Sequence, residues 1–288
     1  MAKVCIVTDS ACDLPPELAS IHGIEIVPLS VRFGAEEYVD RRDLTPQEFW
    51  AKVAASKVLP ETAAPSPGAY EMVFRRAKED GCDGIVVVSL SSKLSATIGA
   101  ATLAAQAVSS EIAVDVIDSL SITMGQGTMT LAAAKAAATG ADLVAVGAVV
   151  RDLVPRTRVF GALNTLENLK KGGRIGGAQA LIGSLLSVKP ILDISSGAVE
   201  QAGKQRTRSK SLAHLAQLVA DVKAQHGHVE NVAVMHGDAD DVDEFLTLLD
   251  KSFPREEILV GQIGAVIGTH GGPGVMGLTF CIPAVQRN

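Results

Sequence analysis

The chain has 288 residues and a formal net charge of −6, with 26 Lys and Arg against 32 Asp and Glu. This balance excludes the strongly basic surface that is typical of nucleic-acid binding. Apolar residues make up 47% of the sequence but aromatic residues only 3%, so Ala, Val, Leu and Ile build the interior, a mix that favours an α/β protein. A chain of this length usually forms more than one hydrophobic core. We therefore expect two domains, residues 1–155 and 156–288.

Short β-rich runs alternate with helical patterns in the first half, which predicts an N-terminal parallel-sheet α/β/α domain. Two helices have strong start signals, because Thr45-Pro46-Gln47-Glu48 is a capping box and Ser66-Pro67 opens in a similar way. The predicted strands are Val4 to Thr8, Ile24 to Val31, Ile85 to Ser89 and Val114 to Ile117. Other helices are predicted between Ser95 and Ser110, from Met124 to Thr139 and from Asp142 to Val154.

The regular alternation of strands and helices ends at Pro155. The second half of the sequence predicts a C-terminal domain with a mixed sheet covered by helices. The strands are predicted at Val159 to Leu163, Val188 to Ile194, Val232 to His236, Ile258 to Gln262, Val266 to Thr269 and Val275 to Cys281. The helices are predicted at Leu166 to Lys170, Ala178 to Leu186, Ser209 to Gln225 and Asp240 to Lys251.

The segment from Ile258 to Gln286 carries no formal charge and is long enough to cross a membrane. The run His270-Gly271-Gly272-Pro273-Gly274 at its centre would break a helix, so short buried strands are the better interpretation. The N-terminus lacks a charged region followed by a long apolar one, so we expect no signal peptide and a cytoplasmic protein.

The four cysteines, Cys5, Cys12, Cys82 and Cys281, form no C-x-x-C pair. Three of them lie in or beside apolar runs. They are therefore expected to be reduced, structural thiols.

Small polar residues follow the predicted parallel strands, where ligands of open α/β sheets bind. They are Thr8-Asp9-Ser10, Ser89-Leu90-Ser91-Ser92 and Asp118-Ser119, with Thr62-Ala63-Ala64-Pro65-Ser66 at a similar level. One interpretation is that these residues only cap helices and form turns. The other is that their hydroxyls and helix amides receive a carboxylate or phosphate oxygen, with Ser95 balanced between the two roles.

A basic turn, Lys170-Lys171-Gly172-Gly173-Arg174, is joined directly to an uncharged run from Ile175 to Val188. This run is too short to span a bilayer and is interrupted by glycines and serines. The junction predicts an anion site beside an apolar wall, which suits a ligand with one charged end and a long apolar body.

Several other kinds of site lack their signature. There is no G-x-S-x-G to support an esterase, although His270-Gly271-Gly272 resembles an oxyanion loop. There is no G-x-x-x-x-G-K-[ST], and Gly125-Gln126-Gly127 lacks the third glycine of a dinucleotide site. His226-Gly227-His228 is interpreted as a surface turn, so no metal and no cofactor are expected.

These motifs, in this order, resemble the DegV family over essentially the whole chain. The matching segments are Val7-Thr8-Asp9-Ser10, Thr62-Ala63-Ala64-Pro65-Ser66-Pro67-Gly68, Ser91-Ser92-Lys93-Leu94-Ser95-Ala96-Thr97, Val116-Ile117-Asp118-Ser119, Thr165-Leu166-Glu167-Asn168-Leu169-Lys170-Lys171-Gly172-Gly173-Arg174-Ile175, Ile182-Gly183-Ser184-Leu185-Leu186 and Gly268-Thr269-His270. The lysine-glycine-arginine stretch is the most specific of them. Lys93 and Ala96 depart from the family, which usually has glycine at both positions.

The resemblance implies a two-domain α/β protein that holds one long-chain fatty acid between its domains. It also implies that the protein serves a separate ATP-dependent kinase subunit, which phosphorylates the carboxylate to an acyl phosphate for phospholipid synthesis. By position, Thr62 and Ser95 would hydrogen-bond the carboxylate, while Arg174 and His270 would complete the polar network. Arg174 would also assist phosphoryl transfer.

The acyl-chain wall is expected from Ile182, Leu185 and Leu186, together with the helix after Ser95. Two alternatives to the kinase role remain open, namely a lipid-sensing or transport protein and a free-standing enzyme that uses Asp9, Asp118 and His270 as acid and base groups. The basic cluster Lys204, Arg206, Arg208 and Lys210 is interpreted as a solvated surface, with docking to an acidic partner or transient contact with an anionic membrane as alternatives.

Overall fold

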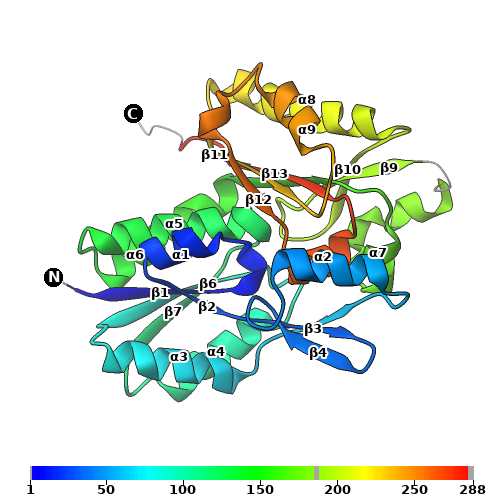
Figure 1. The fold of residues 1–288 in the computed structure, drawn as a ribbon. Coiled ribbons are helices and arrows are strands. Elements are labelled where there is room, and N and C mark those ends of the chain that lie inside the picture. The colour runs from blue at the N-terminus through cyan, green and yellow to red at the C-terminus, as the bar shows by residue number, and fades with distance from the viewer. Residues whose placement is uncertain (1, 185–187, 285–288) are drawn as a thin grey trace.

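The computed structural model describes residues 2–184 and 188–284, and it is an α/β protein with two main sheets (Figure 1). The first sheet is parallel, with strand order β2-β1-β6-β7. Its strands are β1 (Val4–Asp9), β2 (Ile24–Val27), β6 (Gly84–Ser89) and β7 (Ala113–Asp118). All six residues of β6 are buried, as expected of a central parallel strand.

Helices cover both faces of the parallel sheet. One face packs on α3 (Pro67–Glu79) and α4 (Thr97–Ala107). The other packs on α1 (Pro16–Ile21), α5 (Thr123–Ala138) and α6 (Leu143–Leu153). The start signals read from the sequence are confirmed, because Thr45 and Glu48 form the capping box of α2 (Pro46–Ala55) and Ser66 caps α3.

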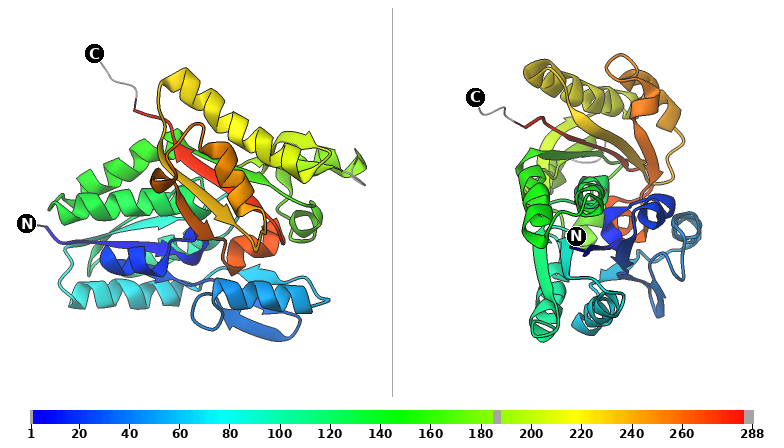
Figure 2. Two further views of the ribbon diagram at one scale, coloured as in Figure 1. Left: turned by 45° about the horizontal axis from the view of Figure 1, so that its top comes forward. Right: turned by 90° about the vertical axis from the view of Figure 1, so that its left-hand side faces the viewer.

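The second main sheet is mixed and has the order β10-β9-β8-β13-β11-β12. Its strands are β8 (Thr157–Ala162), β9 (Lys189–Asp193), β10 (Glu200–Gln205), β11 (Glu230–His236), β12 (Leu259–Gln262) and β13 (Met276–Cys281). Helices α8 (Arg208–His226) and α9 (Val242–Leu249) cover its outer face (Figures 1 and 2). Its inner face is turned toward the first half of the chain.

Smaller elements complete the described chain. A three-stranded antiparallel sheet, β4-β3-β5, is built from β3 (Ser30–Phe33), β4 (Glu36–Val39) and β5 (Glu61–Ala63). Two short helices, α7 (Glu167–Lys171) and α10 (Ala265–Gly271), lie at the end of the six-stranded sheet nearest to this small sheet. The 3-10 turns are η1 (Ser10–Cys12), η2 (Val154–Arg156), η3 (Gly176–Ser184) and η4 (Arg255–Glu257).

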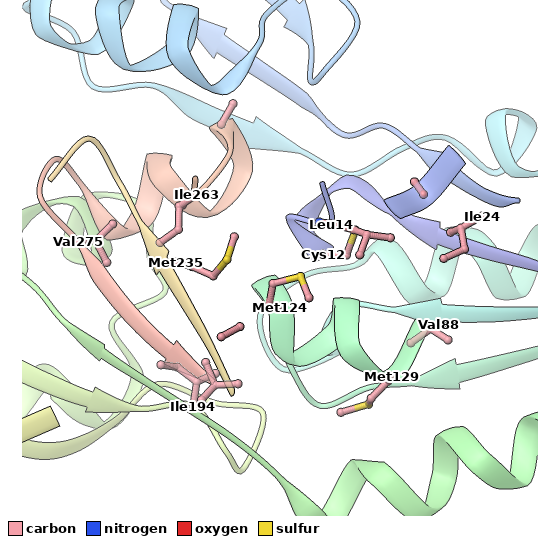
Figure 3. Packing of buried hydrophobic residues seen from close by; sticks show 14 of the residues in the cluster. Cys12, Leu14, Ile24, Val88, Met124, Met129, Ile194, Met235, Ile263 and Val275 are labelled. Carbon is pink, nitrogen blue, oxygen red and sulfur yellow. The ribbon is translucent and has the colours of Figure 1, made fainter. Parts of the chain in front are cut away.

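One apolar cluster joins the two halves of the chain. Figure 3 shows Met235 and Ile263 of the second half across from Met124 and Leu14 of the first. Polar contacts cross the same boundary, because Trp50 Nε1 donates to the Ile263 carbonyl at 2.9 Å. The halves therefore pack against each other through a shared interior.

Three predicted elements were wrong in detail. The strand predicted from Ile24 to Val31 divides at Pro28, so β2 joins the parallel sheet and β3 the small one. The strand predicted from Val266 to Thr269 is helix α10, which ends at Gly271 and is followed by Gly272 with φ +75°. The helix predicted from Ala178 is the 3-10 turn η3 as far as Ser184, and the rest of that prediction lies outside the described residues.

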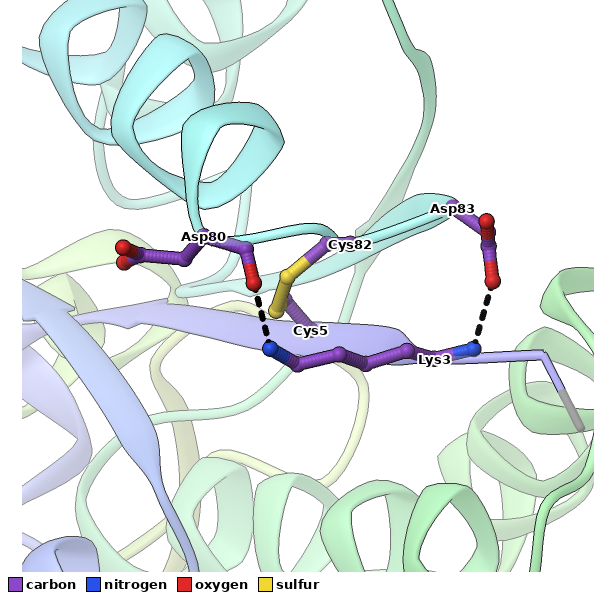
Figure 4. Close-up of a disulfide and its surroundings, with 5 residues drawn as sticks. All are labelled: Lys3, Cys5, Asp80, Cys82 and Asp83. Carbon is purple, nitrogen blue, oxygen red and sulfur yellow. Dashed lines mark hydrogen bonds between the residues drawn. A yellow bond between two sulfur atoms is a disulfide. The ribbon is translucent and has the colours of Figure 1, made fainter.

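The expectation of four reduced cysteines is wrong for Cys5 and Cys82, which form a disulfide with a Cα–Cα distance of 5.9 Å (Figure 4). The two residues meet because Cys5 lies on β1 and Cys82 precedes β6, the parallel neighbour of β1. Lys3 reinforces this contact through its backbone amide, which donates to Asp83 Oδ2 at 2.8 Å. Cys12 and Cys281 are free and buried.

The basic cluster is less uniform than the sequence implied. Lys204, Arg206 and Lys210 are exposed, but Arg208 makes two bonds to Asp241, at 2.7 and 3.0 Å. Arg208 therefore joins α8 to the start of α9 and is not part of a free basic surface. None of the helices in residues 2–184 and 188–284 is long and apolar enough to cross a membrane.

Candidate functional site

A cavity lies between the inner face of the six-stranded sheet and the loops of the first half. Together with its open mouth it has about 840 Å³ of empty space. Only five of its described lining residues are polar or charged: Thr62, Ser95, Thr123, Arg174 and His270. The apolar lining side chains are Leu29, Leu90, Leu94, Ile122, Val159, Phe160, Leu163, Leu169, Leu192, Ile194, Val199, Ile263, Val266, Ile267 and Val275. Such a lining favours an apolar ligand.

All four residues predicted to bind a carboxylate line this one cavity, although they come from four separate segments. Thr62 lies on β5 and Ser95 in the loop after β6. Arg174 follows α7, and His270 is near the end of α10. The fold thus assembles the predicted set from both halves of the chain.

His270 is the most deeply placed titratable group of the set. Its Nε2 lies 3.0 Å from Thr62 Oγ1, while its buried Nδ1 has no hydrogen-bond partner among the described residues. Burial and the positive charge of Arg174 lower the pKa of the His270 ring to about 4. The imidazole is therefore neutral at pH 7, with one nitrogen that donates and one that accepts.

Arg174 is positioned by the glycines of the basic turn. Helix α7 ends in a Schellman motif, because Arg174 N donates to the Leu169 carbonyl at 3.0 Å and Gly173 has φ +69°. A side chain at Gly172 would collide with the His270 ring, so the first glycine permits the histidine to approach. The sequence Lys-Lys-Gly-Gly-Arg is thus a helix end that places a guanidinium beside an imidazole.

The guanidinium also connects the two halves of the site. Arg174 Nε donates to the Leu94 carbonyl at 3.2 Å, and Nη1 donates to the Gly172 carbonyl at 2.7 Å. Ser95, next to Leu94, accepts from Thr97 N at 3.3 Å and lies 2.9 Å from Thr97 Oγ1. Ser95 therefore both supports the start of α4 and lines the cavity, which combines the two roles considered from the sequence.

A second hollow adjoins the first on the outside and is polar. Thr62, Arg174 and His270 line both, and Lys57 and Lys171 line only the outer one, which has about 1080 Å³ of empty space with its mouth. The three shared side chains thus stand between an apolar interior and a polar exterior. A charged ligand atom held by them would be open to a second molecule from outside.

The other polar strand-end residues serve the loops and do not line the cavity. Asp9 accepts from Leu90 N at 2.9 Å, Ala11 N at 3.2 Å and Ser89 Oγ at 3.2 Å, and burial raises the pKa of its carboxyl to about 6. Asp118 accepts from Ser92 N at 3.2 Å and Leu120 N at 2.9 Å. The structure therefore does not bring Asp9 and Asp118 to His270 as an acid and base set in the cavity.

Two hydrogen bonds join the loop after β6 to the β9–β10 hairpin. Lys93 Nζ donates to the Ser196 carbonyl at 2.7 Å, and Ser91 Oγ donates to the Gly197 carbonyl at 2.6 Å. The lysine that departs from the usual glycine thus ties the loop after β6 to the six-stranded sheet.

The wall of the cavity differs from the expected one. Leu185 and Leu186 lie outside the described residues, as does the side chain of Ile182, so their role stays a prediction. Helix α4 is fully described and contributes no lining residue, because it packs on α3 and the parallel sheet. The described wall comes instead from β8, β9 and α10 and from the residues around β13.

Sequence reasoning also missed Thr123, which lines the cavity at the start of α5. It has φ +46°, a rare conformation for a β-branched residue, and its buried hydroxyl lies beside the buried carboxyl of Asp13. No signal around Ile122-Thr123-Met124 distinguishes this residue from an ordinary helix start. Within residues 2–184 and 188–284 there is no group of three His, Cys, Asp or Glu side chains that could hold a metal ion.

Comparisons with known proteins give a consistent result. The family described as "Uncharacterised protein, DegV family" matches residues 3–282. A DegV domain-containing protein of Streptomyces coelicolor is 36% identical over 96% of this chain and 97% of its own length. One from Deinococcus radiodurans is 34% identical over 96% of this chain and 98% of its own length.

Solved structures resemble the chain over its full length. A fatty-acid-binding DegV family protein from Thermus thermophilus has a TM-score of 0.87 and 36% identity, and the match covers 98% of this chain and 100% of that one. A stearic-acid-binding protein from Eubacterium ventriosum has a TM-score of 0.89 and 28% identity, with 98% of both chains covered. DegV of Bacillus subtilis, a fatty acid binding protein, has a TM-score of 0.87 and 29% identity, with 98% and 100% covered.

Proposed function

This chain belongs to the DegV family, and we propose that it binds one long-chain fatty acid in the cavity and presents the carboxylate to a separate ATP-dependent kinase subunit. Residues 1–155 and 156–288 form two domains in this proposal. The first supplies Thr62 and Ser95, and the second supplies Arg174 and His270. The product is an acyl phosphate for phospholipid synthesis.

One observation carries this proposal. Thr62, Arg174 and His270 stand between a cavity of almost entirely apolar side chains and an outer hollow that also contains Lys57 and Lys171. An acyl chain fits the inner side, and a phosphate group fits the outer side, where Lys57, Lys171 and Arg174 outweigh the negative charge of Glu61. The carboxylate then lies at the boundary, attached to the acyl chain on the inner side and accessible to a phosphate group on the outer side.

The energetics agree with a fatty acid as the ligand. Each buried methylene contributes about 0.8 kcal/mol, so a chain of roughly 16 carbons offers on the order of 12 kcal/mol before the cost of ordering. An ionised carboxylate taken from water costs several kcal/mol unless charge-assisted hydrogen bonds meet it. Arg174 supplies the opposite charge, and the Thr62 and Ser95 hydroxyls supply the additional donors.

His270 contributes as a neutral group in this arrangement. With a proton on Nε2, the ring donates to Thr62 Oγ1, and the Thr62 hydroxyl is then free to donate to the carboxylate. Its low pKa, about 4, keeps the ring from adding a second positive charge beside Arg174. Arg174 therefore remains the cation that orients the carboxylate and stabilises the charge that develops during phosphoryl transfer.

Two measurements test the proposal. Mass spectrometry of an organic extract of the purified protein should find bound long-chain fatty acid, and a protein that is empty and fails to bind added oleate or palmitate would refute lipid binding. The lipid-loaded chain, combined with ATP and the kinase subunit from the same cell, should yield acyl phosphate. A loaded chain that supports no turnover would instead be a lipid-sensing or transport protein.

A further inference from the structure

Two glycines interrupt the apolar lining of the cavity at adjacent positions. Gly161 on β8 and Gly277 on β13 both line the cavity, and they are direct partners in the antiparallel ladder. Gly161 is also paired with Leu192 of β9, and Gly277 with Met235 of β11. One row across the sheet therefore consists of Leu192, Gly161, Gly277 and Met235. Its two central residues have no side chain, and its two outer residues have large ones.

Neither glycine is required by its backbone. Both lie inside regular strands, and neither has a positive φ. Glycine in a strand interior weakens the strand relative to alanine, so some other factor accounts for its presence at both positions.

Neither glycine is required by packing against protein atoms. A Cβ at Gly277 would lie 3.4 Å from the Met235 carbonyl oxygen and 3.9 Å from Ile263 Cδ1, and a Cβ at Gly161 would lie 3.5 Å from Leu163 Cδ1. These are ordinary contact distances. Gly268 and Gly237 differ, because a Cβ there would approach the Trp50 ring to 2.7 and 2.6 Å.

The remaining explanation is that the space over these two positions is kept free for a ligand. Adjacent rows of the same face carry Val159, Leu163 and Val275, so the gap lies between side chains along each strand. Val275 also lies against Gly271, the neighbour of His270, and Gly277 is two residues further along the chain, about 7 Å in a strand. The gap is thus one row deeper than the polar end of the cavity.

We propose that Gly161 and Gly277 form the floor of the acyl-chain channel and determine the length of chain that it accepts. This inference rests on the proposed fatty-acid site. A methyl group on the floor would narrow the channel, and a long chain has more methylenes beyond that point than a short one. Each methylene that is displaced should weaken binding about 4-fold.

The test compares lauric with stearic acid. Each acid is titrated into delipidated wild-type protein and into the Gly161→Ala, Gly277→Ala and Gly161→Val variants, by displacement of a fluorescent fatty acid. The ratio of stearic to lauric affinity should fall at least 4-fold in each alanine variant and further in Gly161→Val. The melting temperature of both alanine variants, without ligand, should equal or exceed that of the wild type.

Gly203→Ala is the control, because it adds the same methyl to a strand of the same sheet outside the cavity, where the new Cβ would lie 3.1 Å from the flexible His214 side chain. Its affinity ratio should equal that of the wild type. Wild-type protein that binds both acids, with folded alanine variants that keep its ratio, would overturn the inference alone. Wild-type protein that binds neither acid would refute the proposed function and the inference with it.

Discussion

Two groups of buried polar side chains lie near the cavity, and only one of them lines it. Asp9 has three donors on its carboxylate, Ala11 N of η1, and Ser89 Oγ and Leu90 N at the end of β6. His270 has Thr62 on one nitrogen, and its other nitrogen faces Gly172. A polar side chain whose bonds are all used within the protein shapes a loop, whereas the Thr62 hydroxyl, which His270 supports and which lines the cavity, is available to a ligand.

Substitution of Arg174 should give the largest effect on the ligand side of this comparison. For Arg174→Ala we expect acyl phosphate formation to fall about 100- to 1000-fold, the usual cost of removing one group that stabilises transition-state charge. Lipid binding should fall much less, because the acyl chain supplies most of the affinity. The measurement is turnover with the kinase subunit, with Arg75→Ala as a control on the surface of α3. Unchanged turnover would remove Arg174 from its proposed role.

The second largest effect should be a pH dependence of the unfolding free energy that is due to His270. Its folded pKa, about 4, is below its unfolded value of 6.5, so the neutral ring contributes stability that is present above pH 6.5 and is lost as the pH falls through 4. Over this range the wild type should lose about 3 kcal/mol relative to His270→Gln. Denaturant unfolding of both proteins at several pH values measures this difference. Parallel curves for the two proteins would contradict the low pKa.

Substitutions of Asp9 should lower the stability of the protein and leave acyl phosphate formation unchanged, in contrast to substitution of Arg174. Asp9→Ala leaves two backbone amides and the Ser89 hydroxyl without an acceptor, which should cost about 2 kcal/mol of unfolding free energy. Asp9→Asn keeps one carbonyl acceptor and should cost less. Acyl phosphate formation per bound lipid should match that of the wild type in both variants. A folded Asp9→Ala protein with loaded lipid but no turnover would place Asp9 on the ligand side.

The sequence predicted features that depend on neighbouring residues better than features that depend on residues far apart in the chain. The start signals of α2 and α3 each span only a few residues, and both were located correctly. The division of residues 24–31 between two sheets depends on partners elsewhere in the chain, as does the Cys5–Cys82 disulfide. The short pattern around Val266 suits a strand or a buried helix equally, and its contacts with α2 and β3 decide for α10.

The candidate site divides in the same way. Its polar residues carry recognisable motifs, so Thr62, Ser95, Arg174 and His270 could be proposed before their positions were known. Its apolar wall carries none, because Val, Leu and Ile that face a cavity have the same pattern as those in the core. Gly161 and Gly277 were the available signal, since an isolated glycine inside a strand marks a close approach by something else.

The smallest effect that we expect concerns Thr62. Thr62→Val removes the hydroxyl that lies 3.0 Å from His270 Nε2 and should weaken fatty-acid binding about 5- to 10-fold, the value of one hydrogen bond. Thr62→Ser keeps the hydroxyl and should bind almost as well as the wild type. If Thr62 acts through the hydrogen bond from His270, the loss in a Thr62→Val and His270→Gln double variant should be smaller than the two single losses combined. Additive losses, measured by fatty-acid titration, would mean that the two side chains contact the carboxylate independently.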